Sequence, residues 1–237
     1  MKESEEVVKD RRLYPKIMHD LAAVILPTLW KREEEAMGIE AKEPPAFVSE
    51  ALIHEEHEAY CAFNGDPRHP ISIELCLWIR RYAERRWKIK GSTGSACDLG
   101  SGISSWLLER SRFEPVAHFE ADPEWSAKVR EHFAERYPLE ARLELKRWPE
   151  DAGGEFDLVL LDTSDTGPGG DRFASLVRAA KMTAPGGLLL LDDWHWPSWR
   201  EAATLFLSFG GFSITSLQES TLDQWGRSAA VARRPRA

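Results

Sequence analysis

The chain of 237 residues is long enough for one large domain, or for one domain with a modest extension. Hydrophobic residues make up 43% of it and charged residues 30%, a balance that is typical of globular proteins and excludes wholesale disorder. The net charge of −8 argues against a nucleic-acid partner, and no apolar run approaches the roughly 20 residues that cross a bilayer.

The sequence begins MKESEEVVKDRR, which is charged and has no apolar stretch like that of a signal peptide. We therefore expect a cytoplasmic protein with no membrane partner. The three cysteines, Cys61, Cys76 and Cys97, are scattered along the chain. This spacing favours reduced thiols over a disulfide framework or a zinc site.

Residues 1–90 show helical periodicity with few clusters of β-branched residues. Apolar side chains from 18 to 26 fall on one helical face, and a second amphipathic pattern begins at Ile73. We expect an N-terminal helical extension over residues 1–90 that forms a lid over the active site. Three side chains near its junction with the core are expected in this lid: Tyr60, Phe63 and His69.

Two polar clusters in this extension have both a functional and a plain interpretation. A basic cluster could bind nucleic acid, but aromatic residues interleave with it at helical spacing. His54 and His57 lie one helical turn apart and could bind a metal. In both cases we favour a solvated helix face. The basic cluster consists of Arg80, Arg81, Arg85, Arg86 and Lys88.

From about residue 94, short apolar runs alternate with amphipathic stretches. Five runs are predicted to be strands: 96–99, 116–119, 143–145, 158–161 and 188–191. Two of the intervening stretches are predicted to be helices: 125–136 and 172–182. The alternation predicts a doubly wound, Rossmann-like α/β domain over residues 91–237, with helices on both faces of a mostly parallel sheet.

The end of the chain follows a different pattern. Residues 199–209 are predicted to form a helix that Gly210 and Gly211 terminate. Two late strands, 212–217 and 229–232, are expected to pair around a turn at Gly226.

A glycine turn follows the first predicted strand of this domain. The strand ends at Leu99, the chain turns through Gly100 and Gly102, and a helix begins near residue 104. Glycine permits a positive φ and lets a ligand approach the backbone, and the helix N-terminus presents free amides. A dinucleotide fingerprint would need a third glycine, and Asp98 would repel a pyrophosphate. Asp98 instead suits a ligand with a cationic amine.

A carboxylate, Glu120, ends the next predicted strand, where it can accept hydrogen bonds from both hydroxyls of a ribose. An adenosine ligand with a positive amino-acid tail and no phosphate is S-adenosylmethionine. The plain alternatives are that Asp98 caps the turn and that Glu120 is a solvated strand end.

Four segments carry a family resemblance. D-L-G-S-G from Asp98 and F-E-A-D-P-E-W from Phe119 resemble the first two motifs of class I S-adenosylmethionine-dependent methyltransferases. F-D-L-V-L-L-D from Phe156 resembles their fourth-strand motif, and A-P-G-G-L from Ala184 resembles the turn into the fifth strand. The resemblance covers residues 94–232 in the family's order. It implies that S-adenosylmethionine is the cofactor.

By this resemblance, the cofactor-binding residues lie on the first two strands and the glycine turn. Gly100, Ser101 and Gly102 would line the methionine part, Glu120 would hold the ribose, and Asp98 would sit near the amino group, directly or through water. The family often has an acid after the third strand that holds the adenine amine. This chain has Trp148 there, which could stack on adenine, so the residue that reads the base stays open.

Three aspartates close two neighbouring strands: Asp162 after the fourth, and Asp192 and Asp193 after the fifth. Carboxylates at adjacent strand tips repel each other by about 1 kcal/mol per pair at 4 Å in water, and by about 4 kcal/mol at an effective dielectric of 20. A divalent cation would offset this repulsion, and magnesium retains positions for substrate. We therefore expect a magnesium site. Asp162 would also contact the cofactor.

This acidic pattern resembles the metal-dependent O-methyltransferases of the macrolide and aminocoumarin sugar type more than the catechol type, whose last residue is usually Asn. The chain departs from their D-G-D-x-Y motif, which puts Asp165 in doubt as a base. His195 is the other candidate base, because its unperturbed pKa lies near 6.5. The plain alternative is that Asp162 only contacts the ligand and Asp193 caps a turn.

Tryptophans around His195 are expected to form an aromatic rim for a flat or apolar acceptor: Trp194, Trp196 and Trp199. The sequence thus predicts methylation of a hydroxyl on a small-molecule acceptor with a divalent metal, in a protein that could form a homo-oligomer. Two alternatives stay open: a metal-independent N- or C-methyltransferase, and a non-catalytic protein that binds S-adenosylmethionine.

Overall fold

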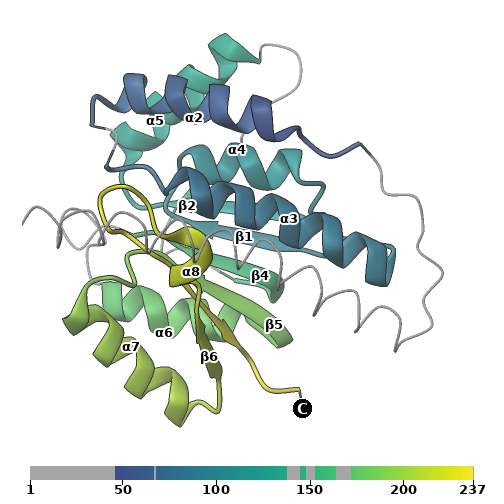
Figure 1. Cartoon of the computed structure of the whole chain (residues 1–237), viewed down its shortest axis with the longest axis vertical. Helices are drawn as coiled ribbons and strands as arrows, with labels where there is room; N and C mark the ends of the chain where they lie inside the picture. Colours follow the sequence, from purple (N-terminus) through teal and green to yellow (C-terminus); the bar gives the residue numbers. More distant parts are fainter. Residues whose placement is uncertain (1–45, 67, 138–144, 148–152, 164–171, 237) are drawn as a thin grey trace, which may run out of the picture.

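A seven-stranded sheet with the strand order β3-β2-β1-β4-β5-β7-β6 organises the protein (Figure 1). The computed structural model describes residues 46–66, 68–137, 145–147, 153–163 and 172–236. The strands are β1 (Ala96–Leu99), β2 (Val116–Glu120), β3 (Leu145–Arg147), β4 (Phe156–Leu161), β5 (Thr183–Leu191), β6 (Ser213–Ser216) and β7 (Ala230–Arg233). The helices are α2 (Glu50–Asn64), α3 (Ile73–Lys90), α4 (Ile103–Arg110), α5 (Pro123–Arg136), α6 (Arg172–Met182), α7 (Pro197–Phe209) and α8 (Gln218–Thr221).

The first five strands run parallel, and β7 lies antiparallel between β5 and β6. Strand β1 pairs with both β2 and β4, so the direction of winding reverses at β1 and β4. In open α/β sheets, ligands bind beyond the carboxyl ends of the strands at such a switch point. The fold therefore places the glycine turn after β1, Glu120 at the end of β2 and Asp162 after β4 on the same edge.

Helices cover both faces of the sheet (Figure 1). Because side chains alternate along a strand, Leu158 and Leu160 of β4 join a core under α2, α3, α4 and α5, while Val159 and Leu161 join a second core under α6 and α7. All four side chains are fully buried. The predicted doubly wound α/β fold with helices on both faces is confirmed.

The predicted elements match the observed ones with local differences. The late strands pair antiparallel as β6 and β7, and the short helix α8, which the sequence analysis did not predict, lies between them. Helix α5 begins at Pro123, two residues before the predicted start, because the side chain of Asp122 caps it by accepting from the backbone N–H groups of Glu124 and Trp125. The predicted third strand overlaps β3 at Leu145, and residues 143–144 lie outside the described residues.

The described part of the predicted N-terminal extension, which contains α2 and α3, packs against the sheet. Leu75, Cys76 and Ile79 of α3 are fully buried in the same core as the sheet, so α2 and α3 share a hydrophobic core with the strands. The helix predicted at 18–26 lies outside the described residues. None of the described helices is long and apolar enough to cross a membrane.

The prediction of a solvated helix face is wrong for His57. Its side chain is buried, and its Nε2 atom lies 2.8 Å from the carbonyl oxygen of Ile71. His54, one turn earlier, is exposed. The two histidines therefore do not face a common metal position, since His57 joins α2 to the segment that precedes α3.

Candidate active site

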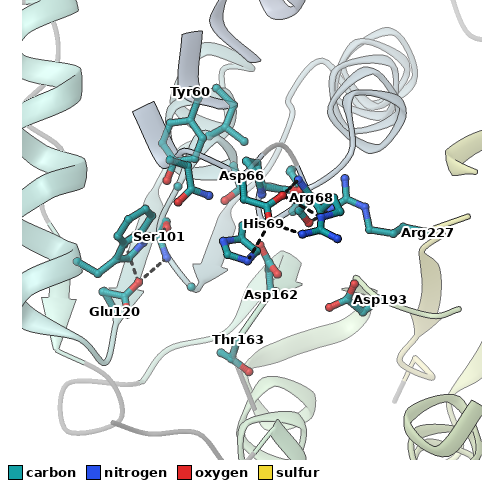
Figure 2. A pocket seen from close by; sticks show the side chains of 18 of the residues that line it. Tyr60, Asp66, Arg68, His69, Ser101, Glu120, Asp162, Thr163, Asp193 and Arg227 are labelled. Carbon is teal, nitrogen blue, oxygen red and sulfur yellow. Dashed lines mark hydrogen bonds and ion pairs between the residues drawn. The ribbon is translucent and has the colours of Figure 1, made fainter. Parts of the chain in front are cut away.

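A cavity of about 880 Å³ opens at the carboxyl edge of the sheet. This volume lies within the range of small-molecule and cofactor sites. Its walls come from the glycine turn after β1, the ends of β2 and β4, the loop after β5, the end of α2 with the following segment, and the turn before β7. Figure 2 shows side chains from these walls converging on one space. Residues far apart in the sequence thus build one site.

The two glycines of the turn are required by close packing. Gly100 has a φ of +104°, and a Cβ there would lie 2.0 Å from the backbone carbonyl oxygen of Asp162. Gly102 has extended backbone, and a Cβ there would lie 2.9 Å from the hydroxyl oxygen of Tyr60. The turn therefore passes between the end of β4 and a tyrosine from α2, and both glycines line the cavity.

Asp98 lies beneath this turn. It is fully buried, and its Oδ2 atom accepts hydrogen bonds from the hydroxyls of Ser104 at 2.9 Å and Ser105 at 2.6 Å. Asp98 is not among the residues that line the cavity, and its Oδ1 atom has no hydrogen-bond partner among the described residues. The geometry favours the interpretation that Asp98 holds the start of α4. Its contact with a ligand amine stays a prediction.

Glu120 and Trp125 fix Ser101 from two sides. One carboxylate oxygen of Glu120 accepts from the backbone N–H of Ser101 at 2.9 Å and from its hydroxyl at 2.8 Å, as Figure 2 shows. The other accepts from the backbone N–H of Asp122 at 2.9 Å. The indole N–H of Trp125 donates to the carbonyl oxygen of Ser101 at 3.0 Å. All four residues line the cavity, and the sequence analysis did not single out Trp125.

The structure brings the three predicted aspartates together. One ligand oxygen from each of Asp162, Asp192 and Asp193 lies within 4.8 Å of the others. Burial and the neighbouring carboxylates of Asp192 and Asp193 raise the pKa of Asp162 well above its usual value. Burial, followed by the charge of Asp193, raises the pKa of Asp192 to about 7. The positive side chains nearby therefore do not fully offset the negative charge of the cluster.

Arg172, which the sequence analysis missed, supplies part of the counter-charge. It is buried, and its Nη1 atom donates to Oδ2 of Asp193 at 3.0 Å, while Nη2 lies 3.4 Å from the carbonyl oxygen of Asp192. Three carboxylates that lie close together are a donor set that fits an oxygen-seeking divalent cation. Asp162 and Asp193 line the cavity, whereas Asp192 lies behind them.

His195 lines the cavity beside this cluster. Its Nδ1 atom lies 3.9 Å from Oδ1 of Asp193. Burial lowers the pKa of His195, and the positive charges of Arg227 and Arg172 lower it further against the opposing effect of Asp193. A neutral imidazole at neutral pH can accept a proton. Asp165 and Trp148, the other predicted contributors, lie outside the described residues.

The predicted aromatic rim is only partly correct. Trp196 lines the cavity and is 42% exposed. Trp194 and Trp199 are buried in the core under α6 and α7, and the indole N–H of Trp199 donates to the carbonyl oxygen of Asp192. Trp225, from the turn before β7, lines the cavity in their place. Helix α7 begins at Pro197, so Trp199 lies in its first turn, on the side that faces the core.

The helical segment before β1 contributes one wall of the cavity. Tyr60 and His69 line it, as do Asp66 and Arg68 between them (Figure 2). Tyr60 is buried, and its hydroxyl has no hydrogen-bond partner among the described residues. Burial raises the pKa of Tyr60, as do the nearby carboxylates. Phe63 does not line the cavity, because it stacks on the ring of His132.

Solved structures with the same fold were found. One is a cofactor-bound structure of Rv0187 from MTB, with 19% identity, a TM-score of 0.58, and coverage of 78% of this chain and 91% of that chain. A putative O-methyltransferase from Klebsiella pneumoniae has 16% identity, a TM-score of 0.54 and coverage of 81% and 92%. An O-methyltransferase from Bacillus cereus in complex with SAH has 17% identity, a TM-score of 0.52 and coverage of 80% and 91%.

No protein-family model and no curated protein matches the sequence. The similarity is therefore one of fold: the chain has the α/β architecture of these methyltransferases over about four fifths of its length.

Proposed function

We propose that the protein is an S-adenosylmethionine-dependent methyltransferase that acts on a hydroxyl of a small-molecule acceptor. The observation that carries this proposal is the composition of one cavity. The glycine turn and Glu120 form one part of its wall, and Asp162, Asp193 and His195 form another. The glycine turn and Glu120 suit a nucleoside with an amino-acid tail. The carboxylates and the imidazole of His195 suit removal of a proton from an acceptor.

The cofactor fits the first part of the wall. Its methionine portion would lie along Gly100, Ser101 and Gly102, which line the cavity. The two glycines permit the tight turn that presents this backbone. Its ribose would lie at Glu120, whose carboxylate ends β2 and faces the cavity. The O-methyltransferase structure of the same fold in complex with SAH supports S-adenosylmethionine as the cofactor.

The proposed chemistry is a displacement at the methyl carbon. The acceptor oxygen forms the new bond to carbon while the carbon–sulfur bond breaks, and the sulfur keeps the electron pair. The acceptor's proton leaves to the imidazole of His195, which is neutral because its pKa is lowered. The protein's main contribution is to bring oxygen and methyl into line.

A divalent cation, with magnesium as the first candidate, would be held by Asp162, Asp192 and Asp193. When bound there, the cation supplies positive charge that lowers the pKa of a nearby acceptor hydroxyl. The ion pair between Arg172 and Asp193 favours the alternative, a metal-independent methyltransferase, because Arg172 already offsets one of the three negative charges.

Calorimetric titration of the protein with S-adenosylmethionine tests the proposal. Glu120→Ala should weaken binding by about tenfold or more, since a charged hydrogen-bond acceptor is lost. Glu124→Ala is the matched control, because Glu124 is exposed in the first turn of α5 and lies outside the cavity wall. Its affinity should stay within about twofold of wild type. Absence of binding by the wild-type protein would contradict the proposed function.

A further inference from the structure

One arginine in the cavity wall is held in place by protein groups through most of its donors. Arg227, in the turn before β7, is 8% exposed. Its Nε atom donates to Oδ2 of Asp223 at 2.6 Å. Its Nη1 atom donates to the carbonyl oxygen of Pro70 at 2.8 Å and to that of Arg68. These contacts occupy the N–H groups of two of its three nitrogens and fix the plane of the guanidinium.

The third nitrogen has nothing to bind. Nη2 of Arg227 is buried and has no hydrogen-bond partner among the described residues, and Arg227 lines the cavity. A buried charged donor without a partner is costly, and buried polar groups in proteins are normally paired. The partner of Nη2 is therefore expected to come from a molecule in the cavity.

The position of Arg227 assigns this molecule to the acceptor rather than to the cofactor. Arg227 lines the same cavity as Asp193, His195 and Trp196. In Figure 2 it approaches from the wall that also carries Asp193, whereas Ser101 and Glu120 lie across the cavity. A group bound to Nη2 thus belongs to the ligand whose hydroxyl faces His195.

The surroundings of Arg227 indicate the chemistry of that ligand. Its guanidinium carbon lies 5.3 Å from the ring centroid of Trp225, which is 43% exposed. Trp225 and Trp196 present apolar ring surface to the same cavity. One free nitrogen suits a single anionic oxygen group, and the carboxylates of Asp162 and Asp193 disfavour a doubly charged phosphate.

We propose that the acceptor is a carboxylic acid with an apolar or aromatic body, and that Nη2 of Arg227 binds its carboxylate. This inference rests on the proposed function, because it identifies the substrate class of that site. A carboxylate–guanidinium contact is a charge-assisted hydrogen bond, about twice as strong as a neutral one. It would hold the acceptor at one end and leave its hydroxyl free at the other.

The test compares two probes on the wild-type protein loaded with S-adenosylhomocysteine. 3-Hydroxybenzoate and 3-hydroxybenzamide have nearly the same shape and differ in charge. Calorimetry should show that the acid binds about tenfold more tightly than the amide. Equal affinity for the two probes, or binding of neither, overturns the proposal. Binding of S-adenosylhomocysteine itself is measured first, so failure of the proposed function is seen separately.

Two variants test whether the preference for the acid depends on Nη2 of Arg227. Arg227→Lys keeps the positive charge, but one ammonium group cannot serve Asp223, two carbonyls and a ligand together. It should abolish the preference for the acid. Arg68→Gln is the matched control: it removes a charge from the same cavity wall, but Arg68 is already paired through two nitrogens with Asp66.

Arg68→Gln should leave the preference within about twofold of wild type. An equal loss in both variants would attribute the preference to the general field of the cavity and overturn the assignment to Nη2. An unchanged affinity for S-adenosylhomocysteine shows that the cofactor end is intact. If Arg227→Lys fails to fold, the comparison of the two probes on the wild-type protein still decides the question.

Discussion

Nη1 of Arg172 lies 3.0 Å from Oδ2 of Asp193, inside the cluster of three aspartates. The arginine side chain is 5% exposed and also packs against the ring of Trp199 at 4.9 Å. An arginine held in this way is a permanent counter-charge for one carboxylate. Asp162 and Asp192 keep raised pKa values despite it, so the cluster still favours additional positive charge.

A divalent cation should therefore stabilise the protein. Magnesium at about 100 times its Kd should raise the free energy of unfolding by about 2.7 kcal/mol, measured by urea denaturation with and without chelator. Asp193→Asn should lose most of this gain, because it removes one of three ligand oxygens and frees Arg172. Glu201→Gln, an exposed change on α7, is the control.

Methyl transfer gives the second readout of the same prediction. Turnover should fall in excess chelator and recover on addition of magnesium. Full activity in chelator, with no stabilisation by magnesium, would show that Arg172 alone balances the cluster and would favour a metal-independent methyltransferase.

The sequence predicts the sheet well because its strands are defined locally. The central strands β1 and β4 are short apolar runs that are buried on both faces, and the alternation of strands with amphipathic helices implies the layered fold. The edge strand β3 is the weakest match, since it is three residues long and carries the exposed Lys146 and Arg147. Its pattern contains little apolar periodicity to detect.

The site is only partly readable from the sequence. Residues at strand tips, such as Glu120 and Asp162, are predictable because the fold fixes where strands end. Arg227 is not, because the carbonyl oxygen that it binds belongs to Pro70, 157 residues earlier in the chain. The prediction that Trp199 belongs to the aromatic rim is wrong, because nearness in sequence does not imply a shared site. Trp199 is close to Asp193 in sequence, but it lies on α7 and packs in the core.

Gly100→Ala should disrupt the turn that joins β1 to α4. The φ of +104° is unfavourable for alanine, and its Cβ would lie 2.0 Å from the carbonyl oxygen of Asp162. We expect the free energy of unfolding to fall by more than about 3 kcal/mol, measured by urea denaturation. Gly65→Ala is the matched control, because Gly65 has a φ of +78° and a Cβ there would have no described heavy atom within 4 Å.

That control should cost only about 1 kcal/mol, the penalty for a left-handed conformation without a steric clash. Equal costs for the two substitutions would mean that the contact with Asp162 has no effect on the turn.

Tyr60 and Gly102 should show coupled effects on cofactor binding. A Cβ at residue 102 would lie 2.9 Å from the tyrosine hydroxyl, so Gly102→Ala should displace either the turn or the ring and weaken binding of S-adenosylmethionine. Tyr60→Phe removes the clashing oxygen, which has no hydrogen-bond partner among the described residues. The double variant should therefore bind better than Gly102→Ala, with a coupling of about 0.5–3 kcal/mol. Additive effects in calorimetry would contradict a direct contact.

His118 should make the stability of the glycine turn dependent on pH. It is buried on β2, with Nε2 3.0 Å from Oε1 of Glu109 and Nδ1 3.8 Å from Oδ2 of Asp98. Burial lowers the pKa of His118, but the two carboxylates raise it by more, so that the folded-state value lies above the usual one. The folded protein therefore binds this proton more tightly than the unfolded chain does.

The contribution of the protonated His118 should be fully present below about pH 6.5, the ordinary histidine pKa, and should be lost as the pH rises through the higher folded-state value. The measurement is the difference in free energy of unfolding between wild type and His118→Gln. It is determined by urea denaturation at a series of pH values from mildly acidic to mildly alkaline. Taking the difference removes the contributions of the aspartate cluster, which both proteins share. The exposed His54, changed to Gln, is the control. A difference that stays constant or grows with rising pH would show that His118 is neutral in the folded protein, and that Asp98 holds the turn through its serine contacts alone.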